Sequence, residues 1–313
     1  MCEYSIIVPA YNEEKALQLF YDAITPVMES TGESYELIFI NDGSTDETKT
    51  ILDRLTQTDK RVKACHFSRN FGQQSALFCG LQKSSGNAVI TMDADLQDPP
   101  EVALQMIEKW KEGYQIVHGK RNKRKGETAF KRGTASLFYK LTRKLTGLDV
   151  PQNTGDFKLY DRQVVGALLS LTERDKLLRV QTAWIGFKQT FVTFDRPERI
   201  AGETHYTVKK MVKLAKAGIF PNTEFTLSFP LKLGLCLGFL SVACFALFMI
   251  LSGCGVYFGG LTAWLFPSLG LGVSIVTICQ GVSNIHLNMV YKEVQNRPQY
   301  IIAEEKNFGE YEC

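Results

Sequence analysis

The chain contains 313 residues, and its 36 Lys and Arg against 33 Asp and Glu give a formal net charge of +3. This length allows one large domain or two of ordinary size. The eight cysteines include no C-x-x-C pair, which argues against a disulfide framework or a zinc site and favours free thiols in a reducing compartment.

Short apolar runs alternate with amphipathic stretches over the first 120 residues, a pattern typical of βα units around a largely parallel sheet. The apolar runs predict strands at residues 5–10, 36–42, 62–67, 87–93 and 115–119. Helices are expected to begin at Asn12, which suits an N-cap, and after the capping-box pattern Ser44-Thr45-Asp46-Glu47. Two more are expected at about 73–83 and in PEVALQMIEKW, which starts at Pro100. The predicted fold class is therefore α/β.

Three of these strands end in polar residues, at 9–13, 41–44 and 93–97. Ligands of open α/β sheets bind outside the carboxyl ends of the strands, so the three ends are expected to meet at a ligand-binding edge. Neither G-x-G-x-x-G nor G-x-x-x-x-G-K-[ST] is present, which removes the main support for a dinucleotide site or a P-loop. A phosphate-bearing ligand would then call for a hard divalent cation held by carboxylates.

In the stretch VITMDADLQDPP, residues 89–100, an apolar strand is followed directly by three aspartates. If the chain stays extended, Asp93, Asp95 and Gln97 lie on one face and form a set of oxygen ligands for Mg²⁺. Asp98 is then expected to cap the helix that follows. The alternative is an ordinary surface turn, in which Asp and Pro are common, and D-x-D alone is a weak signal.

The middle of the chain is strongly basic from residue 120 to 132, and about half of those charges are expected to form a solvated face. Residues 205–220 follow an amphipathic pattern, with Lys209, Lys213 and Lys216 on the polar face. A basic amphipathic helix next to a membrane segment is expected to lie on the lipid surface. An ordinary solvated helix with a core-facing side is the alternative.

The 59 positions from Leu233 to Tyr291 contain no Asp, Glu, Lys or Arg. A membrane helix needs about 20 apolar residues, so this stretch predicts two transmembrane helices, at about 231–257 and 261–285, rather than a buried helical pair. Basic residues on both sides place both chain ends in the cytoplasm and make the protein a multi-pass protein of the inner (plasma) membrane. The predicted organisation is a cytoplasmic domain at 1–204, a basic juxtamembrane helix at 205–228, the membrane pair within 229–290 and a cytoplasmic tail at 291–313.

Several motifs together resemble those of the family-2 glycosyltransferases, in the same order and spacing. They are VPAYNEE, NDGSTDET, RNFGQQSALFCGL, MDADLQDPPE and GKRNKR. GDFKLYDRQVV, RIAGETHYTVKKM and the two apolar C-terminal segments narrow the resemblance to the bactoprenol (undecaprenyl-phosphate) glucosyltransferases, which are related to the dolichyl-phosphate mannose synthases. The resemblance extends over essentially the whole chain.

This resemblance implies that residues 1–204 form a catalytic domain with the GT-A fold, followed by the two-helix transmembrane hairpin. The nucleotide-sugar-binding residues that it implies are Pro9, Tyr11, Glu13, Asp42, Asp93, Ala94, Asp95, Arg121 and Arg132. The implied ligands of a Mg²⁺ or Mn²⁺ ion are Asp93, Asp95 and Gln97. The residues implied in catalysis are Asp95, Asp156 and Arg199, with Asp156 either a base or a group that orients Arg199 or the acceptor.

The implied activity is inverting transfer of a hexose, with UDP-glucose as the expected donor and undecaprenyl phosphate as the expected acceptor. A divalent ion and arginines would stabilise the negative charge that builds on the departing nucleoside diphosphate. A lipid phosphate is already anionic at neutral pH, so it needs orientation more than a strong base. Because relatives form tetramers, a homo-oligomer is expected, and nucleic acid is not an expected partner.

Two other functions remain open at this stage. One is transfer to a sugar hydroxyl or a polysaccharide, although the Q-x-x-R-W of processive synthases has only Gln181-Thr-Ala-Trp184 as a counterpart. The other is a non-catalytic, glycosyltransferase-like partner of a flippase, against which the intact set of Asp93, Asp95 and Gln97 argues. The residues also leave UDP-N-acetylhexosamine and GDP-mannose open as donors.

Overall fold

The computed structural model describes residues 2–122, 147, 151, 154–173, 177–195 and 262–309. The chain divides into two compact units. The first consists of Met1–Arg143, Leu148–Ala217 and Pro298–Cys313, and the second of Lys144–Gly147 and Gly218–Arg297.

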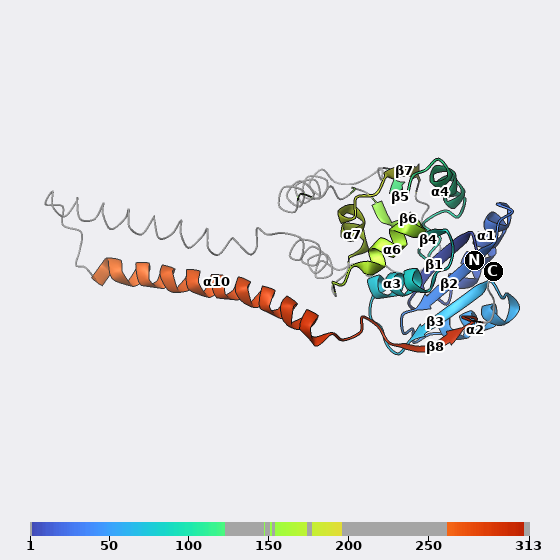
Figure 1. The fold of residues 1–313 in the computed structure, drawn as a ribbon. Coiled ribbons are helices and arrows are strands. Elements are labelled where there is room, and N and C mark those ends of the chain that lie inside the picture. The colour runs from blue at the N-terminus through green and yellow to red at the C-terminus, as the bar shows by residue number, and fades with distance from the viewer. Residues whose placement is uncertain are drawn as a thin grey trace. The chain divides into compact units, whose positions relative to one another are not determined.

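The described residues of the first unit build an eight-stranded sheet with the order β7-β5-β6-β4-β1-β2-β3-β8 (Figure 1). Its strands are β1 (Tyr4–Ala10), β2 (Tyr35–Asn41), β3 (Val62–Phe67), β4 (Ala88–Thr91), β5 (Ile116–Arg121), β6 (Thr154–Asp161), β7 (Gln189–Phe194) and β8 (Ile302–Lys306). The five strands predicted in the first 120 residues are confirmed, although β4 ends two residues early.

The four central strands β3, β2, β1 and β4 run parallel, as the alternating pattern predicts. β6 pairs antiparallel with both β4 and β5, and β5 runs parallel to β7. β8 pairs antiparallel with β3. The sheet is therefore mixed. The carboxyl ends of the four central strands lie along one edge, because parallel neighbours end on the same side.

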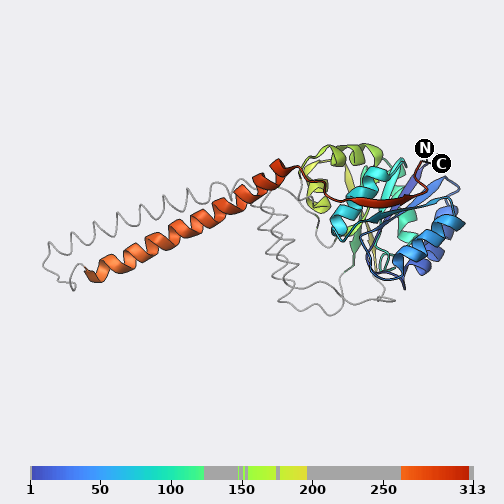
Figure 2. The ribbon, with the colours of Figure 1, turned by 90° about the horizontal axis from the view of Figure 1, so that it is seen from below.

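Helices cover both faces of this sheet (Figure 2). They are α1 (Leu17–Glu29), α2 (Thr48–Thr58), α3 (Gln73–Lys83), α4 (Glu101–Lys111), α6 (Arg162–Ser170) and α7 (Leu178–Trp184). Side chains alternate along each strand, so Ile6 and Val8 of β1 pack with Phe20 of α1, whereas Ile7 packs with Leu77 of α3. The central strands are consequently buried on both faces, which gives the loops at their ends a rigid support.

The helix after β1 begins later than the sequence predicts. α1 starts at Leu17 and has no side-chain cap, so the expected capping role of Asn12 is wrong. Asn12 adopts a positive φ of 56°, donates its backbone N–H to Ser44 Oγ at 3.0 Å and accepts the Thr45 N–H at 2.9 Å. Its side chain therefore joins two loops that are distant in the sequence.

The predicted capping box before α2 is also absent. α2 begins at Thr48, and the residue before it, Glu47, makes no side-chain capping bond. Asp46 instead accepts the N–H of Thr48 at 3.0 Å and that of Glu14, in the other loop, at 3.2 Å. Tertiary pairing of the two loops has replaced the local hydrogen bonds that the pattern predicts.

In the second unit, the described residues include α10 (Thr262–Gln295), which covers the second predicted span and continues beyond it. Across the described ranges, no helix combines the length and the hydropathy that crossing a membrane requires. The two-helix hairpin stays a prediction. The first predicted span (231–257) and the juxtamembrane helix (205–228) lie outside the described residues.

Close packing of α3 on β1 predicts that Gly80→Ala is destabilising. A Cβ at Gly80 would lie 2.2 Å from Cγ2 of Ile7, so the helix has to shift. We expect the free energy of unfolding to fall by about 1–3 kcal/mol. Gly166→Ala in α6 is the control, because a Cβ there meets nothing within 4 Å. This substitution should raise the free energy of unfolding by about 0.5–1 kcal/mol, since alanine favours a helix interior. Urea unfolding measures both, and equal effects would contradict the packing argument.

Candidate functional site

The end of β1 presents three of the predicted nucleotide-binding residues at the edge of the sheet. Pro9 lies in β1 itself, and Tyr11, directly after it, is 46% exposed. The backbone N–H of Glu13 donates to Thr48 Oγ1 at 2.9 Å, which fixes this loop against the start of α2. The structure thus places Pro9, Tyr11 and Glu13 together, as predicted.

Asp42, at the end of β2, is buried and holds the loop that follows β3. Its Oδ1 accepts the N–H of Phe71 at 2.6 Å and its Oδ2 the N–H of Gly72 at 2.9 Å. Burial raises the pKa of the Asp42 carboxyl, and these two hydrogen bonds act against the rise. Asp42 therefore orients the loop that precedes α3, besides lying at the predicted binding edge.

Close approach of backbones brings Arg69 to the same place. Gly43 has a φ of +67°, and a Cβ there would lie 2.3 Å from the carbonyl carbon of Arg69, so only glycine fits without a shift. The exposed Arg69 side chain stacks its guanidinium over the ring of Phe71, 4.2 Å from the centroid. A cation thus stands next to Asp42, and the sequence analysis does not name it.

The chain turns sharply after β4. β4 ends at Thr91, Leu96 has a φ of 55°, and the N–H of Gln97 donates to Asp95 Oδ1 at 3.1 Å. The prediction that Asp93, Asp95 and Gln97 share one face of an extended strand is therefore wrong, because this side chain-to-backbone bond closes a turn. Asp95 and Gln97 are buried, as is Ala94 between Asp93 and Asp95.

Three carboxylates, those of Asp95 and Asp98 in the turn after β4 and of Asp156 in β6, act on the ionisation of Asp93. Although the Asp93 side chain keeps some solvent contact, burial and the charges of Asp98, Asp156 and Asp95 raise its pKa to about 7, and Arg121 acts against the rise. Like charges that approach this closely disfavour ionisation. The side chains of Asp93, Asp95, Asp98 and Asp156 are here called the carboxylate cluster.

Asp98 points inward instead of capping α4. It is fully buried, and its Oδ1 lies 3.5 Å from Nη2 of Arg121. α4 begins at Glu101, with Pro100 as the preceding residue and no side-chain cap, so the capping prediction is wrong. A Cβ at Gly155 would lie 2.8 Å from the same Nη2, so glycine there leaves room for the guanidinium.

Asp156, on β6, is held from two sides. Gln74 donates from Nε2 to Asp156 Oδ2 at 3.2 Å, and Nη2 of Arg179 lies 3.6 Å from Oδ1. The Thr91 hydroxyl donates to the backbone carbonyl of Asp156. Gln74 also accepts the N–H of Leu178 at 2.9 Å, so α3, β6 and α7 are joined at this carboxylate. Such an arrangement orients Asp156.

Lys158, two residues after Asp156 on β6, is a further basic residue of this region. Lys158 is fully buried, and burial lowers its pKa to about 7, while the charge of Asp156 acts to raise it and that of Arg179 to lower it. Lys158 and Arg179 together offset the negative charge at this end of the carboxylate cluster.

The sequence analysis does not identify Gln73, Gln74, Arg69 or Arg179 as site residues. Gln73 donates to Asp93 Oδ1 at 2.9 Å, next to the contact of Gln74 with Asp156. The available signal is the position of Arg69, Gln73 and Gln74 in RNFGQQSALFCGL, between the carboxyl end of a strand and a helix. Arg179 carries no comparable signal.

Two predicted arginines, Arg132 and Arg199, lie outside the described residues. Within the ranges that the structure describes, no group of three or more His, Cys, Asp or Glu side chains is arranged to hold a metal ion. The predicted metal ligands Asp93, Asp95 and Gln97 are nevertheless neighbours in one turn.

Comparison with known proteins identifies the family. The family model described as Glycosyl transferase family 2 matches residues 5–169. The glycosyltransferase YkcC of Bacillus subtilis is 44% identical over 98% of this chain and 94% of its own length. A prophage bactoprenol glucosyl transferase homolog of Escherichia coli is 38% identical over 96% of this chain and 99% of its own.

The chain therefore belongs to glycosyl transferase family 2, and its mixed α/β sheet is GT-A-like. In fold, it is similar to a mycobacterial protein of known crystal structure, with a TM-score of 0.50, 17% identity, and coverage of 70% of this chain and 72% of the other. The resemblance on which the sequence analysis relies is confirmed.

The two hydrogen bonds to Asp42 predict that Asp42→Asn loosens the loop before α3. An asparagine amide can accept only one of the two N–H groups, so the free energy of unfolding should fall by about 1–3 kcal/mol. Hydrogen–deuterium exchange at Phe71 and Gly72 should become faster. Asp22→Asn, at an exposed position of α1, is the control. Unchanged exchange at Phe71 and Gly72 would contradict the assigned role.

Proposed function

We propose that the protein is an inverting glycosyltransferase that moves a hexose from a nucleotide sugar to a polyprenyl phosphate. The carboxylate cluster at the carboxyl ends of the strands carries the proposal, because it suits a cation–diphosphate. The names of relatives at 38% identity, which are called bactoprenol glucosyl transferases in Shigella phage SfII and Escherichia coli, support undecaprenyl phosphate as the acceptor. UDP-glucose is the proposed donor.

The residues after β4 fit a divalent cation. The neighbouring carboxylates raise the pKa of Asp93, and a cation relieves such repulsion. Mg²⁺ commonly takes one or two protein carboxylates together with substrate phosphates, so Asp95, with Asp93 or Gln97, is sufficient. When bound, Mg²⁺ or Mn²⁺ would neutralise charge on the leaving nucleoside diphosphate.

The proposed donor site lies along the ends of β1 and β2. Pro9, Tyr11 and Glu13 would line the nucleoside pocket, beside Asp42 and the loop that it orients. Arg69 belongs to this loop, and its exposed guanidinium can attract an anionic donor.

Arg121 and Asp156 have separate proposed roles. The guanidinium of Arg121, 3.5 Å from Asp98, is fixed at the edge of the carboxylate cluster and can face a phosphate. Asp156 is already bound by Gln74 and Arg179, so we assign it to orienting the acceptor rather than to removing a proton. The phosphate acceptor is itself anionic and needs little base catalysis. Roles for Arg132 and Arg199 stay predictions.

A transfer assay tests this function directly. The purified full chain is incubated with Mg²⁺ or Mn²⁺, undecaprenyl phosphate and a panel of labelled UDP- and GDP-sugars. We expect labelled lipid from UDP-glucose, and no product once EDTA has removed the ion. Nucleotide release without labelled lipid would instead support a sugar-hydroxyl acceptor, and neither product would support a non-catalytic partner.

Asp95→Ala tests the proposed site within the same assay. Loss of a buried carboxylate beside the diphosphate should reduce transfer by about 100-fold or more. Asp22→Ala, at an exposed position on α1, is the matched control and should retain activity. Full transfer by Asp95→Ala would overturn the assignment.

We propose further that the chain acts at the cytoplasmic face of the plasma membrane. The support is the charge-free stretch from Leu233 to Tyr291 and the lipid nature of the proposed acceptor. Two transmembrane helices and a homo-oligomer remain part of this proposal.

Carbonate extraction tests the membrane proposal. After expression in a bacterium, we expect the chain to remain with the membrane pellet at alkaline pH, because apolar segments in lipid resist extraction whereas electrostatic attachment does not. Release of the chain into the supernatant would contradict the two spans.

A further inference from the structure

The segment after α10 returns to the sheet at the edge where the proposed donor site lies. β8 runs antiparallel to β3, and Ile302, at its start, pairs with Phe67 at the carboxyl end of β3. Lys306, at its end, pairs with Ala64. The first residues of this C-terminal segment are therefore near the loop that follows β3, and its last residues are near the opposite end of that strand.

Tyr300 contacts this loop through a stack of aromatic rings. Its ring is stacked on Phe67, with centroids 4.9 Å apart and planes at 11°. Phe67 in turn packs edge-on against Phe71, at 5.8 Å and 87°. The Tyr300 hydroxyl donates to Gln82 Oε1 at 2.6 Å. The carbonyl of Ile301 accepts the N–H of Ser68, in the loop, at 3.0 Å.

The same loop is held on its other side by the proposed donor site. Phe71 donates its N–H to Asp42 and lies under the guanidinium of Arg69, and a Cβ on Gly43 would collide with the Arg69 backbone. Phe71 is thus fixed between Asp42 and the ring stack of Phe67 and Tyr300. A change at Tyr300 can therefore reach both Asp42 and Arg69, the groups that would face the donor, through Phe67 and Phe71.

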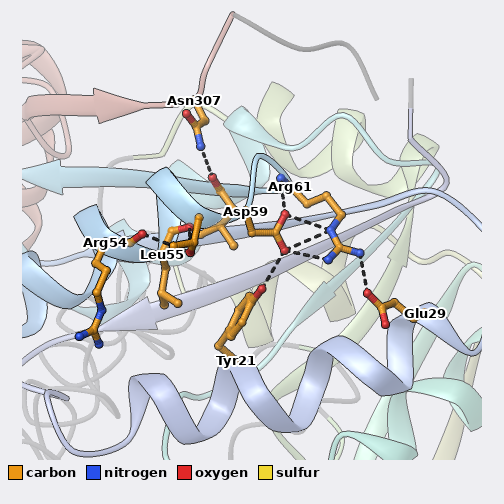
Figure 3. A network of polar contacts seen from close by, with 9 residues as sticks. Tyr21, Glu29, Arg54, Leu55, Asp59, Arg61 and Asn307 are labelled. Atoms are coloured by element: carbon orange, nitrogen blue, oxygen red, sulfur yellow. Dashed lines mark hydrogen bonds and ion pairs between the residues drawn. The ribbon is translucent and has the colours of Figure 1, made fainter.

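The far end of β8 is attached by separate contacts. Asn307 donates from Nδ2 to the carbonyl oxygens of Thr56 and Val62, both at 2.8 Å. These bonds lie beside the network of Tyr21, Asp59 and Arg61 near the amino end of β3 (Figure 3). Asn307 therefore stabilises β8 without touching the loop after β3, which makes it a control for stability alone.

We propose that Tyr300 is a positioning residue of the donor site. Its ring stacks on Phe67, and through Phe67 and Phe71 it sets the loop that carries Arg69 and is bound by Asp42. The C-terminal segment thereby supports the proposed donor site from behind the loop that follows β3. This inference rests on the proposed function, because it takes the ligand at this edge to be a nucleoside diphosphate.

Nucleotide binding by matched variants tests the inference. Titration calorimetry with UDP or GDP and Mg²⁺ gives Kd for the full-length protein and for Tyr300→Leu, Tyr300→Phe and Asn307→Ala. Loss of an aromatic pair should weaken nucleotide binding by Tyr300→Leu about five- to tenfold. Tyr300→Phe, which keeps the ring and loses only the hydroxyl, should bind within about twofold of the wild type. Asn307→Ala should lower Tm and leave Kd unchanged.

Transfer kinetics add a readout that a general loss of stability would not give. Tyr300→Leu should raise KM for the nucleotide sugar and leave kcat and the KM for the lipid acceptor nearly unchanged. Equal nucleotide affinity of Tyr300→Leu and wild type, or an equal loss in Asn307→Ala, would overturn the inference while the proposed function stands. Failure of the wild type to bind either nucleotide would overturn the proposed function and this inference with it.

Hydrogen exchange of the unmodified protein provides a test that does not depend on a folded variant. Addition of UDP and Mg²⁺ should slow exchange at the amides of Phe71, Gly72 and residues 300–302, and leave residues 305–307 unaffected. Protection of the loop without protection of residues 300–302 would show that the C-terminal segment is not coupled to the donor site.

Discussion

The buried carboxylate of Asp42 organises the edge of the sheet where the candidate site lies. Removing a carboxylate from water opposes its ionisation, and hydrogen bonds from the Phe71 and Gly72 amides compensate. Because these amides directly precede α3, the same bonds determine where that helix begins. Gln73 and Gln74, its first two residues, then reach Asp93 and Asp156. The two hydrogen bonds of Asp42 thus connect the end of β2, through the start of α3, to the turn after β4 and to β6.

The second constraint is electrostatic. The charges of Asp95, Asp98 and Asp156 act on Asp93, and basic residues of β5, β6 and α7 lie close enough to offset them. Arg121 extends from the end of β5, Lys158 lies within β6, and Arg179 belongs to α7. The compensation is partial, since the pKa of Asp93 remains raised to about 7. The raised pKa of Asp93 is one reason why we propose a divalent cation beside these carboxylates.

Local signals in the sequence predicted elements well and their ends poorly. β3 and α3 occupy the predicted residues, because alternating or helical apolar patterns select the same structure in isolation and in the sheet. Asn12 has the residue type of a helix cap, yet its side chain binds the neighbouring loop instead, and Asp46 divides its two oxygens between Thr48 and the neighbouring loop. The choice between a local and a distant hydrogen-bond partner depends on which loops lie side by side, and periodicity carries no information on that.

By itself, the sequence determined the central βα pattern, the polar strand ends and the family, because residue type and spacing express burial and chemistry directly. It also brought Asp42, Asp93, Asp95, Asp156 and Arg121 into the candidate site. Only the tertiary structure decided that β6 and β8 join the sheet antiparallel, that Asp98 faces Arg121, that Gln74 and Arg179 contact Asp156, and that Tyr300 stacks on Phe67. The pairing of β8 with β3 joins residues as far apart in the chain as Ala64 and Lys306. Such contacts follow from strand order and register, which no single segment encodes.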